Sequence, residues 1–151
     1  MTGEFAPIAD LVPHAVPMLM VEQLAAWSPG FAEGRLTLRR DCPFVSDGHA
    51  DSIGALEWMG QTVAACLGQE AFSGGHGVRV GMIIGCPRLE LHRDQVAVGT
   101  QLAVRVNRVR GSDVVSRFQC EVLEIGPGPV DGDPRIASAD LTVFHAERPP
   151  E

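Results

Sequence analysis

One long segment with a helical pattern, flanked by shorter segments that alternate apolar and polar residues, most constrains the fold of this chain. Ser52 can cap a helix that begins at Ile53, and Asp51 adds negative charge near the helix start, where it is favourable. The helical pattern runs to about Phe72, and the sequence Ser73-Gly74-Gly75 ends it. We therefore expect one long helix in the middle of the chain.

Segments with strand patterns lie on both sides of this helix. Before it, two strands joined by a Ser-Pro-Gly turn are expected at Leu19 to Trp27 and Phe31 to Leu38. Two strands, one helix and four more strands predict an α+β fold in which an antiparallel sheet curls round a central helix. The four later strands are expected at Val80 to His92, Thr100 to Val109, Val114 to Glu124 and Ile136 to His145, mostly with alternating patterns, and the last three each have one apolar face.

The positions of small residues and turn residues predict how the helix packs and where a loop lies. Gly60, Ala64 and Gly68 are four residues apart, so one ridge of the helix is almost without side chains and a sheet could approach it closely. The segment 126–134, rich in Gly, Pro and Asp, is expected to be an exposed hairpin loop. The 151 residues suit a single domain, 1–151, of which 1–12 is an N-terminal segment.

Composition narrows the classes of function. A net charge of -7 and the absence of lysine argue against nucleic acid as a partner. Because there is no long apolar run free of charge, we expect no membrane span and a soluble cytoplasmic protein. No C-x-x-C pair or metal-ligand spacing is present, so we expect no metal site. The four cysteines are expected to be reduced core thiols: Cys42, Cys66, Cys86 and Cys120.

The stretch Asp47 to Gln61 holds the candidate catalytic groups. His49 follows Gly48, which permits a tight turn, and its imidazole titrates near neutral pH. Glu57 lies on a helix face with apolar or small neighbours, where burial would raise its pKa. An imidazole beside such a carboxylate suits proton abstraction next to a carbonyl group. For both residues, an exposed side chain without a catalytic role is the alternative interpretation.

Two motifs resemble those of the hotdog-fold 3-hydroxyacyl-[acyl-carrier-protein] dehydratases of the FabZ/FabA kind. They are L-V-P-H-A-V-P-M-L-M at Leu11 to Met20 and G-A-L-E-W-M-G-Q at Gly54 to Gln61. The short spacing between His49 and Glu57, and the run R-V-G-M-I-I-G-C-P-R at Arg79 to Arg88, most resemble the ApeP-type dehydratases of aryl polyene biosynthesis. The resemblance covers nearly the whole chain.

This resemblance implies a cofactor-free lyase that removes water from a 3-hydroxyacyl group on acyl carrier protein and leaves a trans-2-enoyl group. His49 would be the base and Glu57 the acid. Gln61 matches the family's following Gln, whose amide could orient the carboxylate, and we place it near the substrate. Free N–H groups at the helix start would stabilise the thioester carbonyl, and the candidates are Ser52, Ile53 and Gly54.

In this family, the His and Glu of one site come from two subunits of a hotdog dimer, and the acyl chain lies in a tunnel at their interface. The resemblance therefore implies a homodimer, or a heterodimer with a second dehydratase. Methionine adapts to flexible ligands, so candidate tunnel residues are Met18, Met20, Met59, Met82 and Ile84, although core packing explains most of them equally well. Candidates for contact with the acidic carrier protein or its phosphopantetheine phosphate are Arg79, Arg88 and Arg93.

Two other functions remain open. In a hotdog thioesterase, Glu57 would activate water for hydrolysis and His49 would be dispensable. A catalytically silent subunit would bind acyl chains or complete a heterodimer with an active partner. The remaining histidines are expected to be structural or solvated: His14 packing the N-terminal segment, His76 in a loop, and His92 and His145 at strand ends.

Overall fold

The computed structural model describes residues 5–13, 18–75, 80–126, 130 and 132–146. The expectations for His14, His76 and Arg79 concern positions outside these described residues. The elements before the long helix are α1 (Ile8–Leu11), β1 (Gln23–Ser28), β2 (Phe31–Thr37), β3 (Val45–Ser46), β4 (His49–Asp51) and a 3-10 turn (Ser52–Gly54). The helix and the later elements are α2 (Ala55–Ser73), β5 (Val80–Leu91), β6 (Gln95–Ala97), β7 (Gln101–Gly111), β8 (Val115–Ile125) and β9 (Arg135–Ala146).

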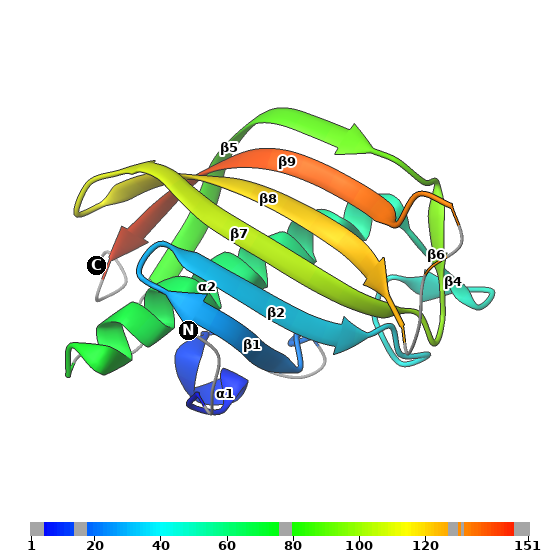
Figure 1. Ribbon diagram of the computed structural model, residues 1–151, viewed down its shortest axis with the longest axis horizontal. Helices are drawn as coiled ribbons and strands as arrows, with labels where there is room; N and C mark the ends of the chain where they lie inside the picture. Colours follow the sequence, from blue (N-terminus) through cyan, green and yellow to red (C-terminus); the bar gives the residue numbers. More distant parts are fainter. Residues whose placement is uncertain (1–4, 14–17, 76–79, 127–129, 131, 147–151) are drawn as a thin grey trace.

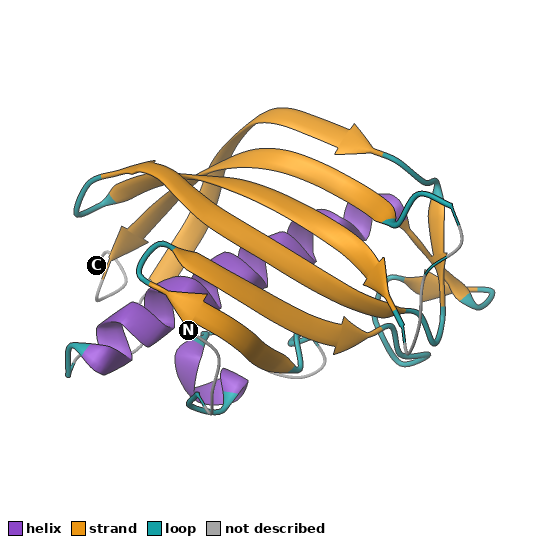
Figure 2. Ribbon diagram, viewed as in Figure 1, coloured by secondary structure: helices purple, strands orange, loops and turns teal. Residues whose placement is uncertain are grey.

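The main sheet has six antiparallel strands in the order β1-β2-β7-β8-β9-β5. Figures 1 and 2 show the sheet curving around α2, which runs across its concave face. The α+β arrangement expected from the sequence is therefore confirmed. β8 ends at Ile125 and pairs antiparallel with β9, which begins at Arg135. The expected exposed hairpin loop 126–134 includes residues outside the described ones and stays a prediction.

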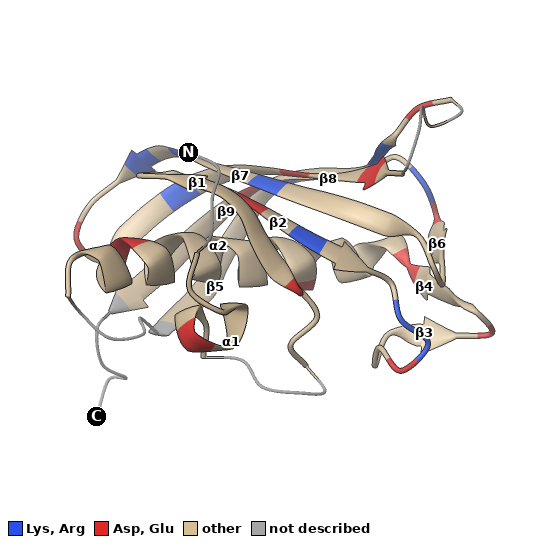
Figure 3. Cartoon of the chain, turned by 60° about the horizontal axis from the view of Figure 1, so that its bottom comes forward, with Lys and Arg blue, Asp and Glu red and all other residues tan. Residues whose placement is uncertain are grey.

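Alternation along the strands explains the core. Leu102, Val104 and Val106 of β7 are fully buried, and so are the inward residues of the next two strands, among them Phe118 and Leu141. Burial of such side chains contributes roughly 1.5 to 3 kcal/mol each relative to exposure. The outward positions carry many of the charged residues, whereas α2 has only two, Glu57 and Glu70, and is otherwise uncharged in Figure 3.

The start of α2 differs in one detail from the expectation. The carboxylate of Asp51, not the hydroxyl of Ser52, accepts the hydrogen bond from the Ile53 N–H, at 2.9 Å. The hydroxyl oxygen of Ser52 is buried and has no hydrogen-bond partner. Asp51 therefore caps a 3-10 turn, from which the α-helix continues at Ala55.

Close approaches to α2 also differ from the expected pattern. A Cβ atom at Gly68 would overlap the backbone carbonyl oxygen of Leu11, so this helix glycine accommodates the N-terminal segment and not the sheet. The sheet approaches closely through a glycine of its own, because a Cβ at Gly34 in β2 would lie 2.8 Å from the hydroxyl of Thr62. The expected sheet contact of the helix ridge is thus wrong for Gly68.

A second, smaller sheet was not expected from the sequence. It contains β3, β4 and β6, and it places His49 opposite Ala97. Asp47 and Gly48 form the two-residue turn between β3 and β4, and both have positive φ, 54° and 79°. These values match a type I′ hairpin, for which Asp-Gly is a preferred sequence.

Two global properties can be stated for the described residues. No helix among them is both long and apolar enough to cross a bilayer. No group of three or more His, Cys, Asp or Glu side chains among them is placed to hold a metal ion. Cys42, Cys66 and Cys120 are buried free thiols as expected, but Cys86 is exposed on β5.

Candidate active site

His49 lies at the start of β4, directly after the Asp-Gly turn. Its side chain is exposed, and its Nδ1 atom is 3.1 Å from the backbone oxygen of Asp47. A neutral imidazole with Nδ1 donating to this oxygen leaves Nε2 as the acceptor. The hairpin thus presents an imidazole nitrogen that is suited to accept a proton.

Glu57 lies in the first turn of α2 and is half-buried. The Nε2 atom of Gln61, one helical turn further on, donates a hydrogen bond of 3.1 Å to Oε1 of Glu57. This contact connects the candidate acid to a side chain that is itself held in place, because Gln61 is completely buried.

The amide of Gln61 uses its hydrogen-bonding capacity within the chain. Its Oε1 accepts from the backbone N–H groups of Met20 (2.8 Å) and Val21 (3.1 Å), and its Nε2 donates to the carbonyl of Met18 as well as to Glu57. The two backbone donors fix which end of the amide faces them, so Nε2 must face Glu57. Gln61 therefore lies behind the carboxylate, where it is completely buried, and its expected contact with the substrate stays a prediction.

An apolar cavity of about 270 Å³ opens beside Glu57, between α2 and the strands β5 and β9. Among the lining residues that the structure describes, Glu57 alone is charged. The lining residues are Glu57, Gly60, Val63, Ala64, Leu67, Gly81, Met82, Ile83 and Val143.

The expected tunnel residues are distributed over several places. Met82 lines the cavity beside Glu57, whereas Met59 is completely buried in the core. Met20 is also buried, and it lines a separate hollow of about 470 Å³ that includes neither Glu57 nor His49. The sequence pattern did not distinguish these environments, because a methionine pattern is the same for a core and for a binding cavity.

His49 and Glu57 are not joined by a hydrogen bond or ion pair within one chain, and His49 is not part of the cavity lining. The first residue belongs to the small sheet and the second to α2. A site that uses both residues therefore needs something beyond this arrangement of a single chain to bring them to one substrate.

The helix-start donors are mostly used within the chain. The Ser52 N–H donates to the carbonyl of Asp94 at 3.0 Å, and the Ile53 N–H donates to the Asp51 carboxylate. The ring of Phe44 lies over Gly54, where a Cβ would be 3.0 Å from Cδ2 of that ring. The expectation that Ser52 and Ile53 offer free N–H groups to a thioester oxygen is therefore wrong for this structure.

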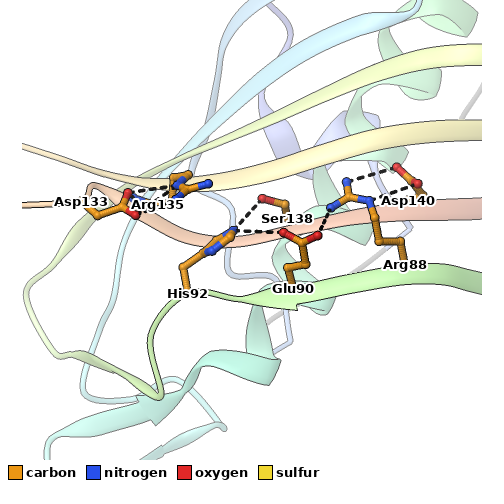
Figure 4. A network of polar contacts seen from close by, with 7 residues as sticks. All are labelled: Arg88, Glu90, His92, Asp133, Arg135, Ser138 and Asp140. Carbon is orange, nitrogen blue, oxygen red and sulfur yellow. Dashed lines mark hydrogen bonds and ion pairs between the residues drawn. The ribbon is translucent and has the colours of Figure 1, made fainter.

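Two of the arginines expected to meet a carrier protein form ion pairs with acidic residues of the same chain. Arg88 forms hydrogen bonds of 3.2 and 3.3 Å with both carboxylate oxygens of Asp140 and a longer ion pair with Glu90 (Figure 4). Hydrogen bonding to Asp140 raises the pKa of Arg88. Arg93 forms an ion pair with Glu124 and donates to the carbonyl of Asp133. Both guanidinium groups thus hold strands and loops of the sheet together.

The chain is similar to known proteins over nearly its whole length. The model of the ApeP-like family, described as ApeP dehydratase, matches residues 6–151. The dehydratase heterocomplex ApeI:P from Xenorhabdus doucetiae is similar in structure, with a TM-score of 0.85 and 21% identity over 95% of this chain and 93% of the other. No curated protein matches in sequence.

Two further structures share the fold at lower similarity. The PaaI protein from the E. coli phenylacetic acid degradation operon has a TM-score of 0.60 and 10% identity over 81% of each chain. A hypothetical thioesterase with coenzyme A from Streptococcus pneumoniae TIGR4 has a TM-score of 0.58 and 10% identity over 82% of this chain and 84% of the other. The hotdog fold expected from the sequence is thereby confirmed.

Proposed function

The chain belongs to the ApeP-like dehydratase family, and from this premise we propose that it removes water from a 3-hydroxyacyl thioester on acyl carrier protein to form the trans-2-enoyl thioester. One observation carries the proposal. Glu57 is a single carboxylate, oriented by Gln61, at an apolar cavity of about 270 Å³ that can take an acyl chain.

The proposed reaction divides the proton transfers between two residues. His49 takes the proton from C2 of the substrate, and the electron pair of that C–H bond forms the new double bond as the C3–O bond breaks. Glu57 donates a proton to the departing oxygen, so that hydroxide leaves as water. Each such group contributes on the order of 10² to 10⁴ in rate.

We propose that a second subunit completes the site. β5 is an edge strand of the main sheet, and its three successive residues Met82, Ile83 and Ile84 are exposed. An unpaired, apolar edge strand is a surface that another chain can cover. Since Met82 and Ile83 also line the Glu57 cavity, a subunit that covers β5 could bring its own His49 to that cavity. The partner is a second copy of this chain or a second dehydratase subunit.

The test is mass spectrometry of a 3-hydroxyacyl-carrier-protein incubated with the purified chain. We expect a loss of one water from the acyl group, and we expect both His49→Ala and Glu57→Gln to lower the rate by on the order of 10² or more while the protein stays folded. His49→Ala with a rate within a few-fold of the wild type would remove His49 from the mechanism.

A thioesterase is the second candidate, because the fold is shared with a hypothetical thioesterase that holds coenzyme A and because the carboxylate of Glu57 lines the apolar cavity. In that case Glu57 would activate water, and free carrier thiol would accumulate instead of the enoyl product. The absence of both products with the purified chain, and their appearance only after a second dehydratase subunit is added, would indicate a silent subunit.

A further inference from the structure

Most arginines in the described part of the chain are neutralised by an acidic neighbour. Ion pairs join Arg35 and Arg105 to Glu33, Arg39 to Asp41, Arg88 to Asp140, Arg93 to Glu124, Arg108 to Glu70 and Arg135 to Asp133. Within the same residues, Arg40, Arg110 and Arg117 are exposed and form no ion pair. In a chain with a net charge of -7, these three cations therefore stand out.

Arg110 and Arg117 are also direct neighbours across the sheet. They are paired residues in the antiparallel register of β7 and β8. Like charges that lie directly opposite on two strands destabilise the sheet, whereas opposite charges there stabilise it. The fold alone would therefore favour an acidic residue at one of the two positions, and the second arginine needs another reason.

Exposed aliphatic side chains surround this arginine pair. Val109 is 51% exposed and Val115 is 37% exposed, on the same two strands. Arginine next to exposed apolar groups is a typical composition of the parts of a protein surface that bind other proteins. We call the surface formed by Val109, Arg110, Val115 and Arg117 the arginine patch.

The arginine patch is connected to the Glu57 cavity by the strand register. Val115 of β8 pairs with Phe144 of β9, and Phe144 pairs with Met82 of β5, which lines the cavity. Two strand spacings place Met82 about 10 Å along the sheet from Val115. A protein bound at the patch would therefore lie at the end of the sheet where the cavity wall is formed, on the face of the sheet away from α2.

We propose that the arginine patch is the docking surface for an acidic protein partner, the carrier protein that bears the thioester substrate. The proposal rests on the proposed function for the identity of the partner. The two guanidinium groups would pair with clustered carboxylates of the carrier, and this pairing would remove their mutual repulsion. The valines would supply the apolar contact between the two proteins.

The test compares the double variant Arg110→Gln/Arg117→Gln with Arg40→Glu. Both change the net charge by the same amount, and Arg40 is an unpaired, exposed arginine outside the patch. Binding to a 3-hydroxydecanoyl carrier protein is measured by titration calorimetry, and turnover is measured with this substrate and with the same acyl group on pantetheine. For the double variant we expect about tenfold weaker carrier binding and a KM raised as much, which corresponds to two exposed ion pairs.

Turnover of the pantetheine thioester and kcat should stay unchanged in the double variant, and Arg40→Glu should bind the carrier like the wild type. Equal losses with both substrates, unchanged carrier binding, or a loss caused by Arg40→Glu instead would overturn the docking proposal. So would a double variant that keeps its carrier affinity but no longer associates with a second dehydratase subunit. Carrier binding by the wild type without any turnover would contradict the proposed function and leave the docking surface supported.

Discussion

The side-chain amide of Gln61 accepts two hydrogen bonds through Oε1 and donates two through Nε2, so its partners determine its orientation. A carboxylate at this position could accept from Met20 and Val21 but could not donate to Met18 or Glu57. It would also place a second negative charge beside Glu57, and one of two adjacent carboxyl groups then retains its proton.

Gln61→Glu should therefore lower the free energy of unfolding by about 1 to 3 kcal/mol at pH 7. The new carboxyl would have a raised pKa in the folded state, so the loss should shrink as the pH falls and the group takes up a proton. Urea unfolding at pH 7 and pH 5 measures this. Wild-type stability of Gln61→Glu at pH 7 would mean that the amide is oriented the other way.

Glu33 is a second residue whose environment differs from that of an ordinary surface carboxylate. Burial raises its pKa, but hydrogen bonds from Arg105 and Arg35 outweigh burial, so the pKa lies below its usual value. A carboxylate with a depressed pKa stabilises the folded state above the unfolded-state pKa, and this contribution is lost as the pH falls through the folded-state pKa.

Glu33→Gln should accordingly cost about 1.5 to 3 kcal/mol at pH 7, the usual range for hydrogen bonds to a charged group. The difference from the wild type should narrow between pH 7 and pH 3, because the contribution of the lowered pKa is lost as the pH falls below the unfolded-state pKa. Denaturant unfolding at both pH values measures the effect. Glu121→Gln is the matched control, because the Glu121 side chain is 43% exposed and its Oε1 atom lies 3.7 Å from the same Arg105, and it should change stability by less than about 1 kcal/mol.

At the same scale, the sequence indicated the candidate acid and base but not how each is held. Glu57 and His49 could be selected because their residue types suit proton transfer and because the surrounding motifs resemble those of a known family. The cap at Asp51 and the buried hydroxyl of Ser52 could not be distinguished, since both residues are good caps and only the local backbone decides between them. The neutralisation of Arg88 depends on Asp140, which is far away in the sequence.

At the scale of elements, the glycines of α2 have different roles. A Cβ at Gly68 would overlap the Leu11 carbonyl, which belongs to the backbone and cannot rotate away. A Cβ at Gly60 would instead meet the side chain of Ile83, with Cδ1 nearest at 3.2 Å. Ile83 is an exposed side chain that can change its rotamer.

Gly68→Ala should therefore lower the free energy of unfolding by about 1 to 3 kcal/mol through overpacking, even though alanine favours the helix. It should also release the N-terminal segment to proteases. Gly60→Ala, the control in the same helix, should be neutral or raise stability by up to about 1 kcal/mol. Thermal unfolding and limited proteolysis compare the two, and equal effects would show that α1 does not pack on Gly68.

The long elements were predictable and the short ones were not. β7, β8 and β9 have eleven or twelve residues each and alternate clearly, so both their existence and their buried faces followed from the pattern. β3, β4 and β6 have two or three residues, too few for a period to be recognised, and His49 pairs with Ala97 across a long sequence separation. The small sheet that positions the candidate base could therefore not be predicted from the sequence.

For the whole molecule, the separation of His49 from the Glu57 cavity is the main constraint on function. If two chains share each site, a dimer of His49→Ala with Glu57→Gln contains one site with both wild-type residues and one with neither. Random mixing of the two inactive variants should then restore about a quarter of the wild-type activity, for isologous two-fold pairing. Neither variant alone can give this result, because both of its sites carry the same defect.

Subunit exchange has to be shown separately. The exposed residues Met82, Ile83 and Ile84 would make the interface apolar, and a stable apolar interface can prevent folded dimers from exchanging subunits. Native mass spectrometry of differently tagged variants, refolded together, measures the fraction of mixed dimers. Activity that rises with this fraction would support a site built from two chains. Mixed dimers with only the background activity of the single variants would place both residues in one subunit's site or separate their roles, and a subunit of another kind would then be needed to supply the base to Glu57.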